Sequence, residues 1–188
     1  MESSDSRVSS ERIGDIDEKT VVVLCGSTKA TLFDQLSPDF RVVPLQVDVA
    51  GDIAEAISQR NIRKFSLVAD SGSVSAALAF ALQSGDSLET LTLIAPPEIA
   101  PKGSQEDFPL EQIGVPTLVL LGTGDEGAAQ ESGRLYARRI PKCFYILVYD
   151  AGHDIACDRP QALYAVLRDF LDYREKFLVP HASSVINP

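Results

Sequence analysis

The sequence predicts a three-layer α/β/α domain built around a mainly parallel, six-stranded sheet. Six apolar segments alternate along the chain with segments whose apolar residues have helical spacing. This alternation is typical of parallel strands joined by helical crossovers. Several of the strand segments are apolar at nearly every position, which is expected of strands that are covered on both faces. The length of 188 residues and the hydrophobic content of 45% suit one domain with a full core.

The strand segments can be placed one by one from their apolar runs. They occupy residues 20–26, 40–47, 65–69, 88–95, 115–122 and 143–149. The second segment contains Pro44, which indicates a strand end or an edge position, because proline has no backbone N–H to donate. The expected helices are a short one through Leu32 and Leu36, followed by residues 52–62, 74–82, 128–140 and 160–177.

The domain boundaries follow from composition. Residues 1–19 are rich in Ser, Asp, Glu and Arg, and we expect them to form a flexible N-terminal arm. The domain then covers residues 20–178, and residues 179–188 form a C-terminal tail. The connection between residues 94 and 115 is polar and only about twenty residues long, so the sequence predicts a domain without a cap.

Charge and cysteine content exclude several classes of function. The formal net charge is −10, which argues against binding to nucleic acid or to an anionic membrane surface. The longest apolar runs are strand-sized, so no membrane span is expected. The three cysteines lack metal-ligand spacing and favour a reduced, cytoplasmic protein without a metal. Gly122 and Gly124 are too few for a dinucleotide fingerprint, and no cofactor is expected. Nothing in the sequence indicates the oligomeric state.

The stretch from residue 65 to residue 82 carries the first candidate functional residue. An apolar strand turns directly into an Ala/Leu-rich helix, with Ser71 at the junction. The N-terminus of that helix offers unpaired N–H groups and the positive end of a dipole, which suit a nucleophile whose reaction develops an oxyanion. Because the strands are parallel, Asp125 and His153, in later loops, belong to the same sheet edge. A hydroxyl, an imidazole and a carboxylate are the groups that activate a serine nucleophile.

The order Ser71, Asp125, His153, each after a parallel strand, resembles the α/β-hydrolase fold superfamily. The resemblance covers residues 20–177 and implies a small core of that fold without a cap domain. It implies that Ser71 attacks a carbonyl carbon, that His153 transfers the proton, and that Asp125 holds the imidazole tautomer. It also implies an oxyanion hole formed by the backbone N–H groups of Ser27 and Gly72.

The sequence departs from the superfamily pattern at three places, two in the turn of Ser71 and one after the first strand. The nucleophile motif G-x-S-x-G has Ala69 and Ser73 at its glycine positions, and Cys25-Gly26 stands where the superfamily has His-Gly. We expect the turn to accommodate these small side chains with some added strain. A second register also remains open, in which Asp70 is the nucleophile and Gly72 follows it by two residues, as in haloalkane dehalogenases and epoxide hydrolases. The strand spacing favours Ser71.

The predicted function is therefore that of a carboxylesterase-like serine hydrolase. Its substrate would be a small-molecule carboxylic ester or thioester, cleaved through an acyl-enzyme. A non-catalytic binding or signalling protein with the same fold is the alternative, because the nucleophile motif lacks its glycines. A lyase or a cofactor-free oxygenase on this fold is a third possibility. Asp154 and Asp158 are interpreted as helix-start residues rather than catalytic ones.

Overall fold

A computed structural model of the chain describes residues 19–24, 35–46, 50–99, 107–125, 127–177 and 185–186. Its centre is a parallel sheet with the strand order β2-β1-β3-β4-β5-β6-β7. The strands are β1 (Thr20–Leu24), β2 (Arg41–Leu45), β3 (Phe65–Asp70), β4 (Leu88–Ile94), β5 (Thr117–Gly122), β6 (Cys143–Val148) and β7 (Val185–Ile186). The six predicted strands are all present. β2 lies at one end of the sheet, as the proline in it predicts.

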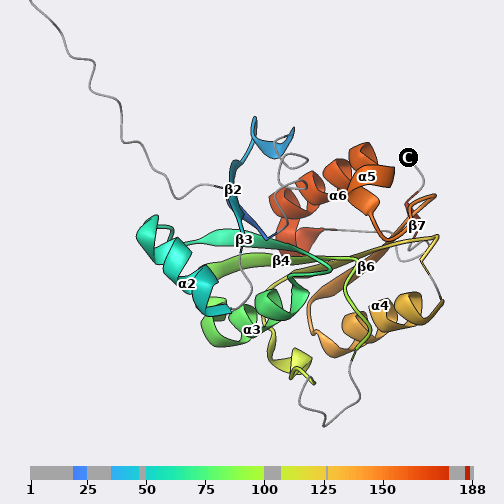
Figure 1. Ribbon diagram of the computed structural model, residues 1–188, viewed down its shortest axis with the longest axis horizontal. Coiled ribbons are helices and arrows are strands. Elements are labelled where there is room, and N and C mark those ends of the chain that lie inside the picture. The colour runs from blue at the N-terminus through green and yellow to red at the C-terminus, as the bar shows by residue number, and fades with distance from the viewer. Residues whose placement is uncertain are drawn as a thin grey trace, which may run out of the picture.

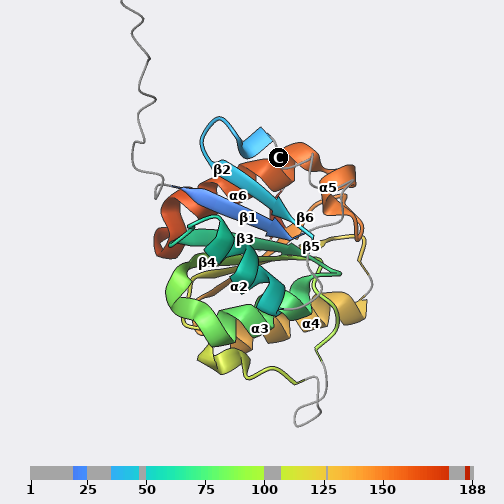
Figure 2. The same ribbon diagram turned by 60° about the vertical axis from the view of Figure 1, so that its left-hand side comes forward.

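Helices cover both faces of the sheet and make three layers. Figures 1 and 2 show α2 (Ala50–Gln59), α3 (Val74–Ser84) and α4 (Gly127–Arg139) on one face. α5 (Ile155–Asp158) and α6 (Pro160–Tyr173) lie on the other face. Short 3-10 turns occur at η2 (Gly85–Ser87), η3 (Leu110–Gln112) and η4 (Arg174–Lys176). The predicted three-layer α/β/α architecture is confirmed.

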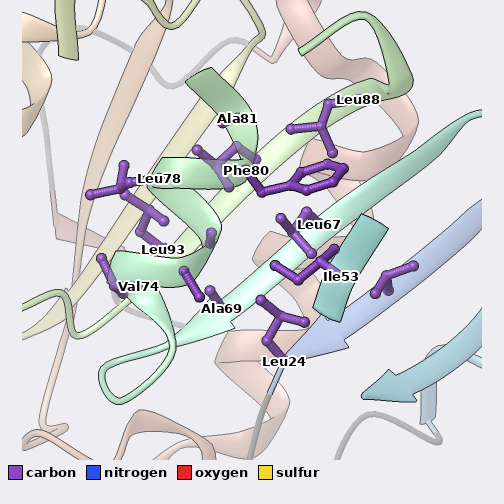
Figure 3. Packing of buried hydrophobic residues seen from close by; sticks show 14 of the residues in the cluster. Leu24, Ile53, Leu67, Ala69, Val74, Leu78, Phe80, Ala81, Leu88 and Leu93 are labelled. Carbon is purple, nitrogen blue, oxygen red and sulfur yellow. The ribbon is translucent and has the colours of Figure 1, made fainter. Parts of the chain in front are cut away.

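Alternating side chains of the buried strands form two cores, one on each face. In β3, Leu67 and Ala69 point to the layer of α2 and α3, where Phe80 packs on Phe65 with ring centroids 5.8 Å apart (Figure 3). Val68 belongs to the opposite core, which α6 covers. This alternation is the period-two pattern of a strand. Because both faces are covered, the central strands are apolar at most positions, and their few polar residues, such as Thr90 and Thr92, are buried as well.

A small aromatic group anchors α6 in the second core. The ring of Phe170, on α6, lies 6.0 Å from that of Phe144 on β6 and 5.5 Å from that of Phe177, in edge-to-face arrangements. Such pairs add about 0.5–1.5 kcal/mol each beyond the burial of their area. They fix the C-terminal end of α6 against the sheet.

One feature of the fold differs from the sequence prediction. Val185 and Ile186, inside the stretch expected to be a tail, pair with Leu147 and Val148 as the seventh strand. Two residues are too few to give a periodic strand signal, so the pairing was not predicted. The predicted helix through Leu32 lies largely outside the described residues.

Candidate functional site

The carboxyl edge of the sheet carries all three residues of the predicted triad. Ser71 follows β3, Asp125 follows β5 and His153 follows β6. Since β5 and β6 are neighbours in the sheet, the acid and the base come from adjacent loops. β4 lies between β3 and β5, so the loop of Ser71 starts about 10 Å from that of Asp125, at two strand spacings.

Asp125 and His153 are brought together as a carboxylate–imidazole pair. Oδ1 of Asp125 lies 3.4 Å from Nδ1 of His153. The other oxygen, Oδ2, accepts a hydrogen bond of 2.8 Å from the backbone N–H of Gly122. The Asp125 side chain is only 6% exposed, whereas that of His153 is 61% exposed. The carboxylate is therefore fixed in the protein, and the Nε2 side of the imidazole is left for another partner.

Further hydrogen bonds hold the acid loop in place. Nε2 of Gln130, in α4, donates to the backbone oxygens of Thr123 and Asp125 at 3.3 and 3.2 Å. The hydroxyl of Tyr145 donates to the backbone oxygen of Gln130 at 3.3 Å. Burial, reinforced by the charge of Asp125, raises the pKa of Tyr145, so its hydroxyl stays protonated and remains a donor.

The histidine loop is tied to the acid loop through backbone contacts. The N–H of Asp150 donates to Oγ1 of Thr123 at 2.9 Å, and the N–H of Gly124 donates to the carbonyl of Ala151 at 2.8 Å. From the other side, Oδ2 of Asp158 accepts the N–H of Gly152 at 2.8 Å. Asp158 is thus a partner of the histidine loop and the last residue of α5, so its interpretation as a helix-start residue is wrong, whereas Asp154 is the N-cap of α5.

Gly122 allows the two loops to approach each other. A Cβ at this position would lie 2.1 Å from the carbonyl oxygen of Ala151 and 2.5 Å from that of Gly152. No side chain fits there without moving the histidine loop. Sequence reasoning treated Gly122 only as the end of a strand and missed this role. A glycine at a strand end three residues before the candidate acid is the signal that could have indicated it.

The turn after β3 accommodates Ser73 through hydrogen bonds. The N–H of Ser73 donates to the backbone oxygen of Asp70 at 2.9 Å. Its hydroxyl donates to the carbonyl of Leu24, at the end of β1, at 2.8 Å, and also lies 3.0 Å from Oδ1 of Asp70. Ala69 is completely buried. The serine at the glycine position therefore bridges two strand ends, because its hydroxyl contacts Leu24 at the end of β1 and Asp70 at the end of β3.

The expected strain in this turn is not found. In the described part of the chain, the non-glycine residues with positive φ lie elsewhere, and Gly72 has no left-handed φ either. A nucleophile elbow is a sharp, strained turn. The turn from Asp70 to Ser73 is relaxed by comparison, because a hydrogen-bonded turn links β3 to α3 without a left-handed residue.

Ser71 lies in this turn with a half-buried side chain, and the exposed Gly72 follows it. Among the residues that the structure describes, no hydrogen bond joins Ser71 to His153. The structure therefore brings Asp125 and His153 into contact, and Ser71 lies on the same edge of the sheet. Ser27, the other predicted oxyanion donor, lies outside the described residues. Oδ1 of Asp70 contacts the hydroxyl of Ser73, so this carboxylate takes part in the turn.

Among the described residues, no three His, Cys, Asp or Glu side chains are grouped so that they could hold a metal ion. No described helix combines the length and the apolar character needed to cross a membrane.

The parallel sheet and the helices on both its faces are shared with solved structures of the α/β-hydrolase fold. A CIB-like hydrolase from Thermoplasma acidophilum has a TM-score of 0.69 and 17% identity, covering 85% of this chain and 88% of its own. Carboxylesterase CesB from Bacillus subtilis has a TM-score of 0.68 and 15% identity. The match covers 84% of this chain and 85% of CesB. A thermophilic esterase from Thermogutta terrifontis has a TM-score of 0.71 and 17% identity. The match covers 82% of this chain and 89% of the esterase. The chain has the α/β-hydrolase fold.

A curated relative supports the same assignment at the level of sequence. The chain is 35% identical over 107 residues to the protein ABHD14A of Rattus norvegicus. The match covers 57% of this chain and 43% of the rat protein, so the chain spans less than half the length of the relative. No family model matches the chain.

Proposed function

We propose that the chain is a serine hydrolase that cleaves small carboxylic esters or thioesters through an acyl-enzyme. The observation that carries the proposal is the contact of 3.4 Å between Oδ1 of Asp125 and Nδ1 of His153. A buried carboxylate on Nδ1 orients the imidazole and stabilises its protonated form, so that Nε2 can take a proton. The names of the solved hydrolases and esterases with this fold agree with that chemistry.

Each residue has a role in the proposed mechanism. Oγ of Ser71 attacks the carbonyl carbon and its proton passes to Nε2 of His153. The oxyanion is stabilised by the backbone N–H of Gly72 and, as the superfamily resemblance implies, that of Ser27. The protonated His153 then gives the proton to the leaving alcohol or thiol, and water hydrolyses the acyl-enzyme by the same route. The odd number of cysteines supports a reducing, cytoplasmic setting for this activity.

Labelling with a fluorophosphonate tests the proposal, because this probe reacts only with an activated serine. We expect the wild-type protein to be labelled and Ser71→Ala to be unlabelled. Ser58→Ala is the matched control, since Ser58 is exposed on α2, away from the turn of Ser71. Equal labelling of Ser71→Ala and wild type would refute the role of Ser71. Activity that is lost in Asp70→Asn without any serine labelling would instead support the Asp70 register.

A second candidate function is a non-catalytic binding protein on the same fold. Two observations favour it: the turn around Ser71 is relaxed, and Ser71 makes no hydrogen bond to His153. This candidate predicts neither fluorophosphonate labelling nor turnover of p-nitrophenyl esters. Turnover that disappears in Ser71→Ala would exclude it.

A further inference from the structure

The helix after the acid loop packs closely on two strands of the site. α4 contacts β5 and β6, the strands that end at the loops of Asp125 and His153 (Figure 1). A Cβ at Gly133, on α4, would lie 2.5 Å from Cε2 of Tyr145 and 2.7 Å from Cδ1 of Leu121, closer than real Cβ contacts come. The helix can therefore approach these strands only because Gly133 has no side chain.

This close approach brings the side chain of Gln130 onto the acid loop. Gln130 lies three residues before Gly133, so the two residues share one side of α4. Its Nε2 lies 3.3 Å from the carbonyl oxygen of Thr123 and 3.2 Å from that of Asp125. A glutamine amide has two N–H groups, so one can serve each carbonyl. The carbonyl of Gln130 itself accepts the hydroxyl of Tyr145 at 3.3 Å, which fixes this turn of α4 to β6.

The two carbonyls belong to the residues through which the acid loop meets the histidine loop. Asp125 carries the carboxylate that lies 3.4 Å from Nδ1 of His153. Thr123 donates its N–H to the carbonyl of Val148 at 3.0 Å, and its Oγ1 accepts the N–H of Asp150 at 2.9 Å. Asp150 has a φ of 55°, a left-handed conformation in which a non-glycine residue must be held by its surroundings. A shift of the acid loop would thus reach the imidazole both through the carboxylate and through the backbone.

We propose that Gln130 is a positioning residue, which keeps the carboxylate of Asp125 against the imidazole of His153. It acts on the backbone of the acid loop and leaves the charge of the carboxylate unchanged, because its amide is neutral and bonds to carbonyl oxygens. Its effect on catalysis rests on the proposed function, whereas its effect on His153 does not. A misplacement of about 1 Å can lower a rate by about 10²-fold, so the loss of both hydrogen bonds should be visible in kcat.

Steady-state kinetics with p-nitrophenyl acetate tests the catalytic part. Gln130→Met keeps the length of the side chain and removes both donors, and Gln130→Glu keeps its shape but turns a carboxylate towards two carbonyl oxygens. We expect kcat to fall at least tenfold in Gln130→Met, and further in Gln130→Glu, with KM within twofold of wild type. Gln59→Met is the matched control, because it removes the hydrogen bond of 2.9 Å from Gln59 to Glu55 on α2 and should keep the wild-type kcat. A wild-type kcat in both Gln130 variants, or a raised KM with unchanged kcat, would overturn the proposal.

NMR of the imidazole tests the positioning without catalysis. The chain has two histidines, so the ring signals of His153 are identified by comparison with His181→Gln. At pH 8 we expect shifted His153 ring signals in Gln130→Met and wild-type signals in Gln59→Met. Gln130→Glu gives the same comparison if Gln130→Met does not fold. Unchanged His153 signals in the Gln130 variants would overturn the proposal, whatever the kinetics.

These measurements keep the two proposals apart. A wild-type protein that shows neither fluorophosphonate labelling nor ester turnover would refute the hydrolase. Shifted His153 signals in Gln130→Met would then still support Gln130 as the residue that holds Asp125 against His153. Conversely, a labelled and active protein whose Gln130 variants match wild type in kcat and in His153 signals would refute only the positioning role.

Discussion

Replacing Gly122 with alanine tests how closely the acid and histidine loops must approach. The added Cβ would lie 2.1 Å from the carbonyl oxygen of Ala151, whereas real Cβ contacts essentially never fall below 3.0 Å. The histidine loop must therefore move by about 1 Å, and the atom in the way is backbone, which cannot rotate aside. Overpacking of this kind costs about 1–3 kcal/mol.

The displacement also acts on the site itself. Gly122 donates to Oδ2 of Asp125, and Ala151 lies two residues before His153. Moving one loop against the other opens the contact of 3.4 Å between the carboxylate and the imidazole. A misplacement of about 1 Å can lower a rate by about 10²-fold, so the proposed hydrolase should lose fluorophosphonate labelling by about that factor.

Urea unfolding and labelling rates measure the two effects separately. Gly114→Ala is the control, because a Cβ at Gly114 meets no atom within 4 Å. We expect this control to keep wild-type labelling and to be as stable as wild type or slightly more stable. Changed ring-proton shifts of His153 in Gly122→Ala would show the loop displacement by NMR. Wild-type stability and unchanged His153 shifts in Gly122→Ala would refute the reasoning.

Three further predictions follow from hydrogen bonds and burial. Ser73→Ala removes the hydrogen bond to the buried carbonyl of Leu24 and should lower the free energy of unfolding by about 1–2 kcal/mol, measured by urea titration; no change would contradict the bridging role. Burial raises the pKa of Tyr136 from its ordinary 10.0 to about 12, so its contribution to stability is complete below pH 10 and is lost as the pH rises through about 12. Between pH 10 and about pH 12, the free energy of unfolding of Tyr136→Phe should therefore fall less than that of wild type. Equal decreases in urea titrations at these two pH values would contradict this. Burial also raises the pKa of Cys143 to about 12, so iodoacetamide at pH 8 should modify the exposed Cys157 and leave Cys143 unmodified in the native protein; peptide mass mapping checks this, and equal modification would contradict it.

Much of the fold could be predicted because its signals are local and repeated. Runs such as residues 65–69 are buried on both faces, so they are apolar at most positions, and this run is followed by a turn and a helical segment. The position of Pro44 also predicted the outer place of β2 correctly. The pairing of Val185 and Ile186 was beyond reach, because it depends on a partner strand nearly forty residues away.

The site was harder to predict than the fold for a physical reason. Parallel strands bring their carboxyl ends to one edge, so the shared edge of Ser71, Asp125 and His153 followed from topology alone. The distances across that edge depend on backbone contacts that no motif encodes, such as the clearance at Gly122. Ser73 illustrates the same limit, because its hydroxyl bonds to Leu24, which is 49 residues away in the chain. The role of Ser71 stays a prediction.

The outer strand of the sheet has a consequence for how the protein behaves in concentrated solution. An uncovered strand offers a row of N–H and C=O groups on which another chain can pair, and this is a common route to aggregation. In β2, Pro44 provides no N–H, and the exposed Arg41 places a charge at the beginning of the strand. At the other end of the sheet, β7 is only two residues long, and such a short strand offers few groups for pairing. Both ends of the sheet are therefore poor templates for edge-to-edge pairing. This lowers the tendency of the protein to aggregate in concentrated solution.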